Sequence, residues 1–254
     1  MRRLALLALF ATACGSTPAS GQALALVFHT GDVYRYSYES NGHVAIDPSP
    51  PDPVHKTGHL AYTVKSVDSN GTADLSLEAS DVVVTSTEGV IPETAGTSLN
   101  GTSEMKVSSD GRILNGTVNG TAFGVAMLWA VLPGRAVKPG DTWSTDSNMS
   151  YPGSITTPFK IKSKYLRDES FQGANAAVVE STFATTATAL PTPGSTTTAT
   201  ETSTSTITSW IDRAAGRILK SHVTSRSVAT FGDSSGSTPP TTVTADEIAD
   251  LLPG

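Results

Sequence analysis

The chain has 254 residues, a single cysteine and a net charge of −6 at pH 7. An acidic balance of this kind gives no electrostatic reason to bind nucleic acid or an anionic bilayer surface, so nucleic acid is not expected as a partner. One cysteine excludes a disulfide within the chain, and a chain of this length can build a hydrophobic core without one.

The N-terminus has the pattern of an export signal. Arg2 and Arg3 precede an apolar run, Leu4–Phe10, which gives way to small residues before Cys14. The run is too short to span a bilayer, so cleavage is expected. The segment resembles bacterial lipoprotein precursors, although Ala11 stands where that family prefers leucine. The resemblance implies that residues 1–13 are a signal peptide and that Cys14 carries a lipid.

That resemblance also implies export and lipid anchoring to the bacterial cell membrane or outer envelope. Residues 14–24 would then be a flexible tether, followed by one β-rich domain over residues 25–254. The alternative is an ordinary secretory signal that is cut within Ser16–Gly21, in which case Cys14 is discarded with the peptide.

An internal duplication is predicted from three landmarks that recur in the same order. Each copy opens on Gly-Asp and an aromatic residue, continues to the tetrapeptide Gly-Arg-Ile-Leu, and closes on Leu-Pro-Gly. The two copies would span about 31–134 and 140–254. The landmarks are Gly31–Tyr34, Gly111–Leu114 and Leu132–Gly134 in the first copy, and Gly140–Trp143, Gly216–Leu219 and Leu252–Gly254 in the second.

Strands are predicted wherever apolar and polar residues alternate with a period of two. Segments 60–67 and 72–79 form such a pair across the turn Asn70-Gly71, and each repeat is expected to have about five strands. The threonine-rich run 185–208 predicts two long polar strands around the Pro191–Gly194 turn. The alternative for that run is a disordered, mucin-like stalk.

Two short helices are predicted, one at the end of each repeat. Thr244 and Glu247 form a capping box before an apolar face that ends at Pro253. Residues Phe123–Leu132 are apolar on nearly every side, which predicts a buried helix packed against the sheet. The functional alternative is that this helix enters a bilayer or lines a ligand cavity.

The expected fold is therefore mainly β, a duplicated antiparallel curved sheet or barrel-like clam with two short helices. A two-sheet β-sandwich is the alternative. Val131–Pro133 followed by Pro139–Trp143 resembles a stretch of uncharacterised β-rich bacterial exported proteins. That resemblance implies a fold and assigns no activity.

One motif is compatible with hydrolase chemistry. Gly232–Gly236 matches the Gly-x-Ser-x-Gly pattern with Ser234 as nucleophile, but prolines rather than a helix follow it and no histidine lies after His222. The interpretation is a flexible serine and glycine loop, and no catalytic residue is predicted. A serine hydrolase is kept as a remote alternative.

Three histidines form the densest group of potential metal ligands. His43, His55 and His59 lie in or beside the proline-rich segment Asn41–Gly58, which predicts a solvated hairpin loop. Imidazole would suit zinc or copper, but the glycine and prolines nearby oppose the helix that the spacing of His55 and His59 would need. No metal and no cofactor are predicted, with these histidines as remote candidates.

The expected function is a membrane-anchored, non-enzymatic envelope lipoprotein that binds or carries a hydrophobic ligand. The alternative is an envelope structural or protein-interaction module whose threonine-rich strands bind another envelope protein. A stripe of three tyrosines on one strand face is interpreted mainly as core, with ligand contact as the second interpretation. The candidate ligand-binding residues are Tyr34, Tyr36, Tyr38, Phe123, Met127 and Trp129.

Overall fold

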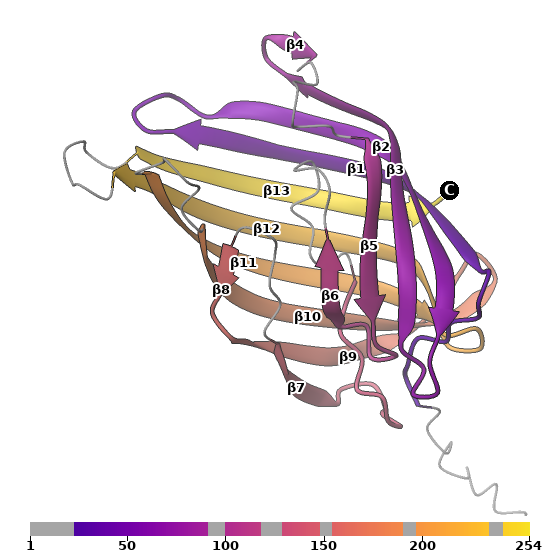
Figure 1. Ribbon diagram of the computed structural model, residues 1–254. Helices are drawn as coiled ribbons and strands as arrows, with labels where there is room; N and C mark the ends of the chain where they lie inside the picture. Colours follow the sequence, from indigo (N-terminus) through magenta and orange to yellow (C-terminus); the bar gives the residue numbers. More distant parts are fainter. Residues whose placement is uncertain (1–22, 91–99, 118–128, 148–153, 190–196, 234–240) are drawn as a thin grey trace, which may run out of the picture.

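A computed structural model describes residues 23–90, 100–117, 129–147, 154–189, 197–233 and 241–254. Every secondary-structure element in these residues is a β-strand, and all of the strands join one antiparallel sheet (Figure 1). The strands are β1 Val33–Ile46, β2 Asp52–Val67, β3 Ala73–Ser86, β4 Gly89–Val90, β5 Gly101–Val107, β6 Ile113–Thr117, β7 Thr142–Ser147, β8 Ser154–Thr156, β9 Phe159–Phe171, β10 Ala174–Ala189, β11 Thr197–Asp212, β12 Arg217–Asp233 and β13 Thr241–Pro253.

The strand order shows two meanders joined by the last strand. The order is β6-β5-β3-β2-β1-β13-β12-β11-β10-β9-β7, with β4 beside β3 and β8 beside β10. Five strands on each side of β13 follow the chain from neighbour to neighbour. Closing a short hairpin loop costs little conformational entropy of the chain, and this favours such meanders. The first predicted copy therefore has the expected five strands in the main path, whereas the second has six, because β13 replaces the predicted helix. The duplication itself stays a prediction.

The two Gly-Asp turns have the same backbone hydrogen bonds. In the first half the Gly31 amide donates to the Val64 carbonyl and the Val64 amide donates to Asp32, at 2.9 Å each. In the second half Gly140 and Asp141 make the matching pair of bonds to Tyr165, at 2.7 and 2.9 Å. Both glycines have positive φ, near 93° and 95°, which glycine adopts without strain. Each turn thereby holds the start of a meander against the next strand of the main path, which is β2 in the first half and β9 in the second.

The predicted hairpin and threonine-rich strands are confirmed. Residues 60–67 of β2 pair with residues 73–79 of β3, with Gly71 at a φ of 78° in the turn, and the pairing continues to His55 and Thr85. The threonine-rich run forms the ends of β10 and β11, which pair over thirteen residues from Ala176 to Thr188. β-branched threonine suits a pleated strand, so residues 185–189 and 197–208 form regular sheet. The predicted Pro191–Gly194 turn lies outside the described residues.

The predicted C-terminal helix is wrong, because Thr241–Pro253 forms the strand β13. It pairs with β12 on one side and β1 on the other. The two ladders satisfy backbone groups along both edges of the segment, and this outweighs the local helix signal of a capping box. The expected apolar helix face is divided between the two faces of the sheet: Leu251 is buried, whereas Ile248 and Leu252 are exposed.

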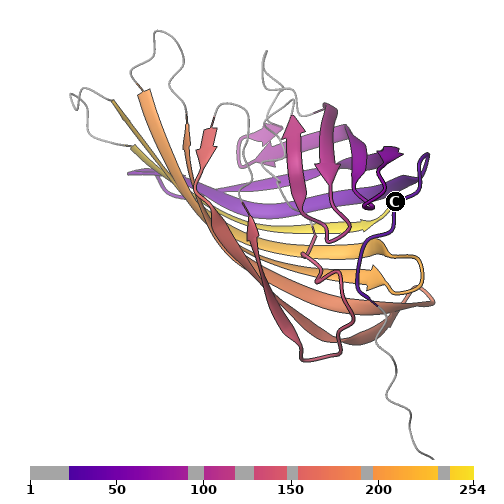
Figure 2. The same ribbon diagram turned by 60° about the horizontal axis from the view of Figure 1, so that its bottom comes forward.

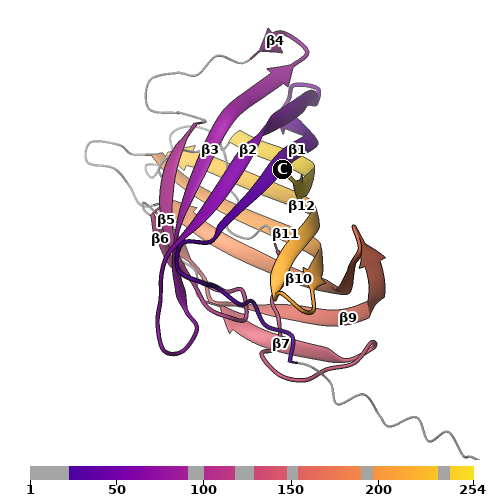
Figure 3. The same ribbon diagram turned by 90° about the vertical axis from the view of Figure 1, so that its right-hand side faces the viewer.

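The sheet is strongly curved and open. Figures 2 and 3 show both ends of the strand order bending toward the same side, which we call the inner face. The terminal strands of the order, β6 and β7, do not pair with each other, so the described sheet does not close into a barrel, and a two-sheet sandwich is not formed. Residues of both halves share the inner-face core, including Leu60, Ile161, Ile207 and Leu251.

Candidate functional site

The inner face is crossed by a short segment, Trp129–Leu132, which we call the crossing segment. Trp129 and Val131 pack into one hydrophobic cluster, while Ala130 and Leu132 pack into a second. All four are at most 5% exposed. This alternation explains why the sequence is apolar on every side: the segment lies between two cores. The predicted burial is confirmed for these residues and the helix is wrong for them, whereas residues 118–128 lie outside the described part.

Buried serines of the sheet hold the backbone of the crossing segment. The Ala130 amide donates to the Ser209 hydroxyl at 2.8 Å, and the Val131 amide donates to the Ser181 hydroxyl at 2.9 Å. Ser209 and Ser181 are fully buried, and a buried amide without a partner would cost roughly 1–3 kcal/mol. Each of the two is also hydrogen-bonded to a serine of the neighbouring strand, Ser221 and Ser163 respectively.

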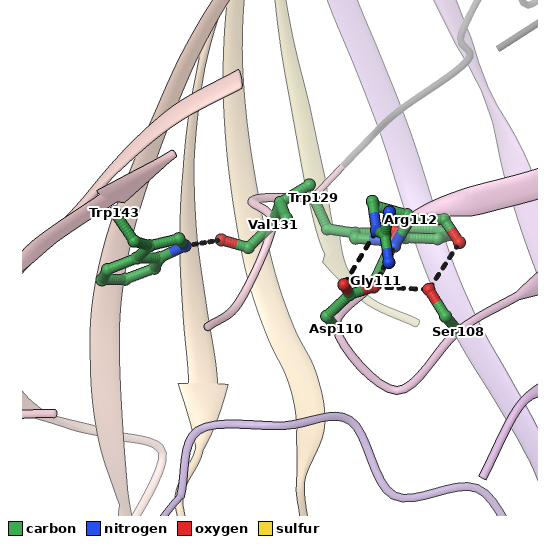
Figure 4. A network of polar contacts seen from close by, with 7 residues as sticks. All are labelled: Ser108, Asp110, Gly111, Arg112, Trp129, Val131 and Trp143. Atoms are coloured by element: carbon green, nitrogen blue, oxygen red, sulfur yellow. Dashed lines mark hydrogen bonds and ion pairs between the residues drawn. The ribbon is translucent and has the colours of Figure 1, made fainter. Parts of the chain in front are cut away.

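Turns and indole groups hold the rest of the crossing segment (Figure 4). The Trp129 indole donates to the Gly111 carbonyl at 2.8 Å, and the Trp143 indole donates to the Val131 carbonyl at 3.1 Å. The Leu132 amide donates to the Asp110 carbonyl at 2.8 Å. The carboxylate of Asp110 pairs with Arg112 at 2.8 Å. Protein groups therefore fill the described part of the inner face next to this segment.

The tyrosine stripe lies on the inner face, and its members contact protein groups. Tyr36 and Tyr38 are buried, and the Tyr36 hydroxyl donates to the Ile218 carbonyl at 2.9 Å. The rings of Tyr36 and Tyr62 pack edge to face with centroids 6.0 Å apart, and Tyr62 packs likewise on Trp129 at 5.5 Å. These contacts agree with the core interpretation of Tyr36, Tyr38 and Trp129.

Tyr34 is only half-buried, and its hydroxyl donates to the Asp32 carboxylate at 3.0 Å. Burial, followed by this hydrogen bond, raises the pKa of Tyr34 to about 12. The same hydrogen bond lowers the pKa of Asp32. Phe123 and Met127 lie outside the described residues, and ligand contact by any of the six candidates stays a prediction.

The opposite side of the sheet, the outer face, has a groove that runs across the strands. One part, of about 730 Å³, lies over β9 to β12, and a second part, of about 590 Å³, lies over β12, β13, β1, β2 and β3. Both parts are lined by Thr224 and Ser225, so they meet on β12. We call the two parts together the transverse groove.

Strand register explains the direction of the transverse groove. One row of directly opposed residues runs along it through eight neighbouring strands, and three consecutive threonines follow the lysine at its β9 end. These short threonine side chains leave a low floor between Lys162 and Ile248, and the twist of the sheet adds curvature. The row is Lys162, Thr182, Thr206, Thr224, Ile248, Asn41, His55 and Thr85.

The part over β9 to β12 is basic. Lys160, Lys162 and Arg226 line it, and all three are exposed. Lys160 pairs with Asp146 at 3.4 Å, and Arg226 pairs with Asp246 at 3.7 Å. Exposed pairs of this kind contribute at most about 1 kcal/mol each to stability. We call this part the basic half.

The part over β12 to β3 is mainly apolar. Ile248, which is 51% exposed, lines it together with Pro53. The methyl groups of Thr85 and Thr224 add apolar surface. The exposed Ile248 side chain lies in a depression, and apolar surface in a depression is a feature of binding sites. We call this part the apolar half.

The three candidate metal ligands lie in strands rather than in a loop, so the predicted loop over Asn41–Gly58 is wrong except for residues 47–51. Pairing of β1 with β2 extends further than the prolines suggested, because Pro53 faces His43 near the end of the hairpin. His55 contacts Asn41 at 2.8 Å, and His59 lies 3.5 Å from Asp81. Among the described residues, no group of three histidine, cysteine or acidic side chains is placed to hold a metal ion.

Two sequence motifs fall outside the part of the chain that the structure describes. Cys14 and the rest of the predicted signal precede residue 23, and Ser234 lies in the gap between β12 and β13. His222 lies on β12, where its Nδ1 contacts the Asp250 carboxylate of β13 at 2.9 Å. Within the described residues, no helix is long and apolar enough to cross a bilayer.

Comparisons with known proteins give a distant structural likeness and no match by family or sequence. No protein-family model matches the chain, and no curated protein matches it. Among solved structures, the chain is similar to one titled lipid-protein interactions in lipovitellin, with 10% sequence identity and a TM-score of 0.43. The match covers 89% of this chain and 25% of the other, so the chain spans about a quarter of that neighbour's length. A likeness at this level assigns neither an activity nor a ligand.

Sequence reasoning missed the transverse groove. The alternation of Lys160, Lys162 and Lys164 indicates one polar strand face, but only the register places Lys162 in line with Thr224 and Ile248. Ile248 was expected on a helix face. If β13 had been interpreted as a strand with a period of two, Ile248 would have been placed on the sheet face away from Leu251. This alternation is the sequence signal that could have revealed the exposed position of Ile248.

Proposed function

We propose that this chain is an exported envelope lipoprotein, anchored through a lipid on Cys14, that binds a hydrophobic ligand in the transverse groove without catalysing a reaction. The observation that carries ligand binding is the apolar half, a depression of about 590 Å³ lined by Ile248 and Pro53. This volume falls within the range of small-molecule sites, roughly 300–1,000 Å³.

Two further observations support this location. Trp129–Leu132 and the tyrosines occupy the described inner face beside them, so the ligand is assigned to the outer face. The transverse groove is also built on paired strands rather than on loops, and such a scaffold holds its shape without the ligand. Binding would therefore cost little ordering of the protein.

The ligand site is tested by filling the centre of the transverse groove. Thr224→Trp places a large ring where the two halves meet, and we expect it to weaken binding of a long-chain fatty alcohol at least about tenfold. The matched control is Thr230→Trp, on the same face of β12 but outside the lining residues. Displacement of an apolar fluorescent dye measures both variants. Equal affinity of Thr224→Trp and the unaltered protein would place the ligand elsewhere.

The anchor is tested by membrane fractionation in a bacterial host. Cys14→Ala removes the only thiol that can be acylated, and we expect it to move the protein from the membrane to the soluble fraction. Ser16→Ala is the control and should leave the protein in the membrane. Retention of Cys14→Ala in the membrane, with an unchanged mass, would contradict lipid attachment.

The non-enzymatic part of the proposal is tested at Ser234 with a fluorophosphonate probe, which labels activated serines. We expect no labelling of the folded protein beyond that of a Ser234→Ala variant. Specific labelling that Ser234→Ala removes would instead support a serine hydrolase. If the protein has no affinity for apolar ligands but binds a partner protein through its outer-face threonines, the result would support an interaction module.

A further inference from the structure

The three lysines on the outer face of β9 differ in their cross-strand neighbours. Lys160 stands opposite Asp146 and pairs with it at 3.4 Å. Lys164 stands opposite Glu180. Lys162 lies between the neutral residues Ser144 and Thr182, and no carboxylate of the described residues pairs with it. Lys162 is therefore the only one of these three lysines that has no acidic residue directly opposite it on a neighbouring strand.

The other cation of the basic half already has a partner. Arg226 pairs with Asp246 at 3.7 Å, on the side toward the apolar half. Positive charge is thus balanced in the middle of the transverse groove and unbalanced at its β9 end. A ligand with one anionic end would be complementary to this distribution if that end lay at Lys162.

The path from Lys162 toward the apolar half has the dimensions of one extended hydrocarbon chain. Four strand steps separate Lys162 on β9 from Ile248 on β13, which is roughly 20 Å at the usual spacing of strands. The transverse groove is two residue rows wide, about 7 Å along a strand. Thr182, Thr206 and Thr224 line the path with methyl and hydroxyl groups.

We infer that the ligand is a single-chain anionic amphiphile, a long-chain fatty acid, whose carboxylate is bound by Lys162 while its hydrocarbon chain lies over the threonines toward Ile248. This inference rests on the proposed function, because it specifies the ligand of the same groove. Lys162 supplies charge selection, whereas the threonines and Ile248 supply most of the contact area.

The test compares a saturated fatty acid with the fatty alcohol of the same chain length. The full chain carries Cys14→Ala, so that no lipid of its own competes. Above the pKa of the fatty acid and at low ionic strength, the protein should bind the acid about two- to fivefold more tightly than the alcohol. Lys162→Gln should abolish this preference, and Lys162→Glu should reverse it.

Lys164→Gln is the matched control. It removes the same charge from the same face of the same strand, but Lys164 lies outside the residues that line the transverse groove. We expect this variant to keep the preference for the acid. Salt should weaken binding of the acid to the unaltered protein and leave binding of the alcohol unchanged, because only the acid uses a charge interaction.

The outcomes separate this inference from the proposed function. If acid and alcohol both bind and Lys162→Gln leaves their ratio unchanged, the inference about Lys162 is wrong and the apolar site stands. If a two-chain phospholipid binds more tightly than the fatty acid, the single-chain ligand is wrong. If neither the acid nor the alcohol binds, the proposed function and this inference are both overturned.

Discussion

Individual glycines and serines determine how the strand ends and the crossing segment fit against the sheet. Gly216 has a φ of 61°, and a Cβ added there would lie 3.0 Å from the Ala25 carbonyl and 2.5 Å from a Val27 methyl carbon. The Gly216 carbonyl also accepts a hydrogen bond from the Val27 amide at 2.8 Å. This glycine is therefore required both for its backbone conformation and for the close approach of the N-terminal segment.

We predict that Gly216→Ala destabilises the protein more than Gly173→Ala. Gly173 also has positive φ, but a Cβ there would contact nothing within 4 Å. Gly173→Ala should cost about 1–2 kcal/mol from backbone strain alone. Gly216→Ala should cost about 1–3 kcal/mol more, because Val27 and Ala25 must move. Urea unfolding measures both, and equal losses would show that the close approach is relieved without cost.

A second residue-scale prediction concerns Ser181. Ser181→Ala removes the acceptor of the Val131 amide and leaves that amide buried, so it should lower the free energy of unfolding by about 1–3 kcal/mol. Ser227→Ala, on the same sheet face and with no side-chain hydrogen bond to another described residue, should change it by less than about 0.5 kcal/mol. A loss at Ser181 as small as that at Ser227 would mean that the amide finds another partner.

At the scale of elements, β13 is the strand that joins the two meanders. Its neighbours β12 and β1 belong to different halves of the chain, so the one sheet depends on this pairing. The local sequence favours a helix by its capping pattern, yet in the sheet Leu251 is buried on one face while Ile248 and Leu252 are exposed on the other. The strand is selected by partners that lie far away in sequence.

Engineered disulfides test the register of β13. Ser37 and Leu252 stand directly opposite each other, within the Cα separation that a disulfide spans. In the Cys14→Ala background, Ser37→Cys with Leu252→Cys should therefore crosslink under mild oxidation. The control, Ser37→Cys with Asp246→Cys, places the second thiol six residues away along the same strand and should not crosslink. Non-reducing peptide mapping distinguishes them, and crosslinking of the control alone would contradict the register.

At the scale of the whole molecule, the two halves share one core. Leu60 of β2, Ile161 of β9 and Ile207 of β11 are fully buried members of the same cluster. A core shared in this way couples the two halves, because neither half buries its apolar face alone. Unfolding of either half therefore exposes apolar surface of the other.

We predict that a core truncation in the first half destabilises the second half equally. Leu60→Ala should cost about 2–5 kcal/mol, and hydrogen exchange should report the same loss for slow amides of β2 and β11. Lys65→Ala replaces an exposed residue of β2. It should change the stability that the slow amides of β2 and β11 report by less than about 0.5 kcal/mol. Protection that falls in β2 but persists in β11 would show that the halves unfold separately.

The sequence by itself determined the β class, the five strands on each side of β13, the hairpin at Asn70-Gly71 and the long threonine-rich strands. These follow from alternation and turn chemistry, which act between residues that are near in sequence. It also determined that residues 129–132 are buried, because an apolar segment must avoid water in any conformation.

Only the tertiary structure decided that Thr241–Pro253 is a strand, that Trp129–Leu132 crosses the inner face without forming a helix, and that the transverse groove exists. Each depends on strands from distant parts of the chain: two ladders convert a helix-prone segment into β13, and buried serines on β10 and β11 replace the hydrogen bonds of a helix. Lys162, Thr224 and Ile248 come into one row only through the register of β9 to β13. Local patterns specify which face a residue takes, whereas long-range pairing specifies its neighbours.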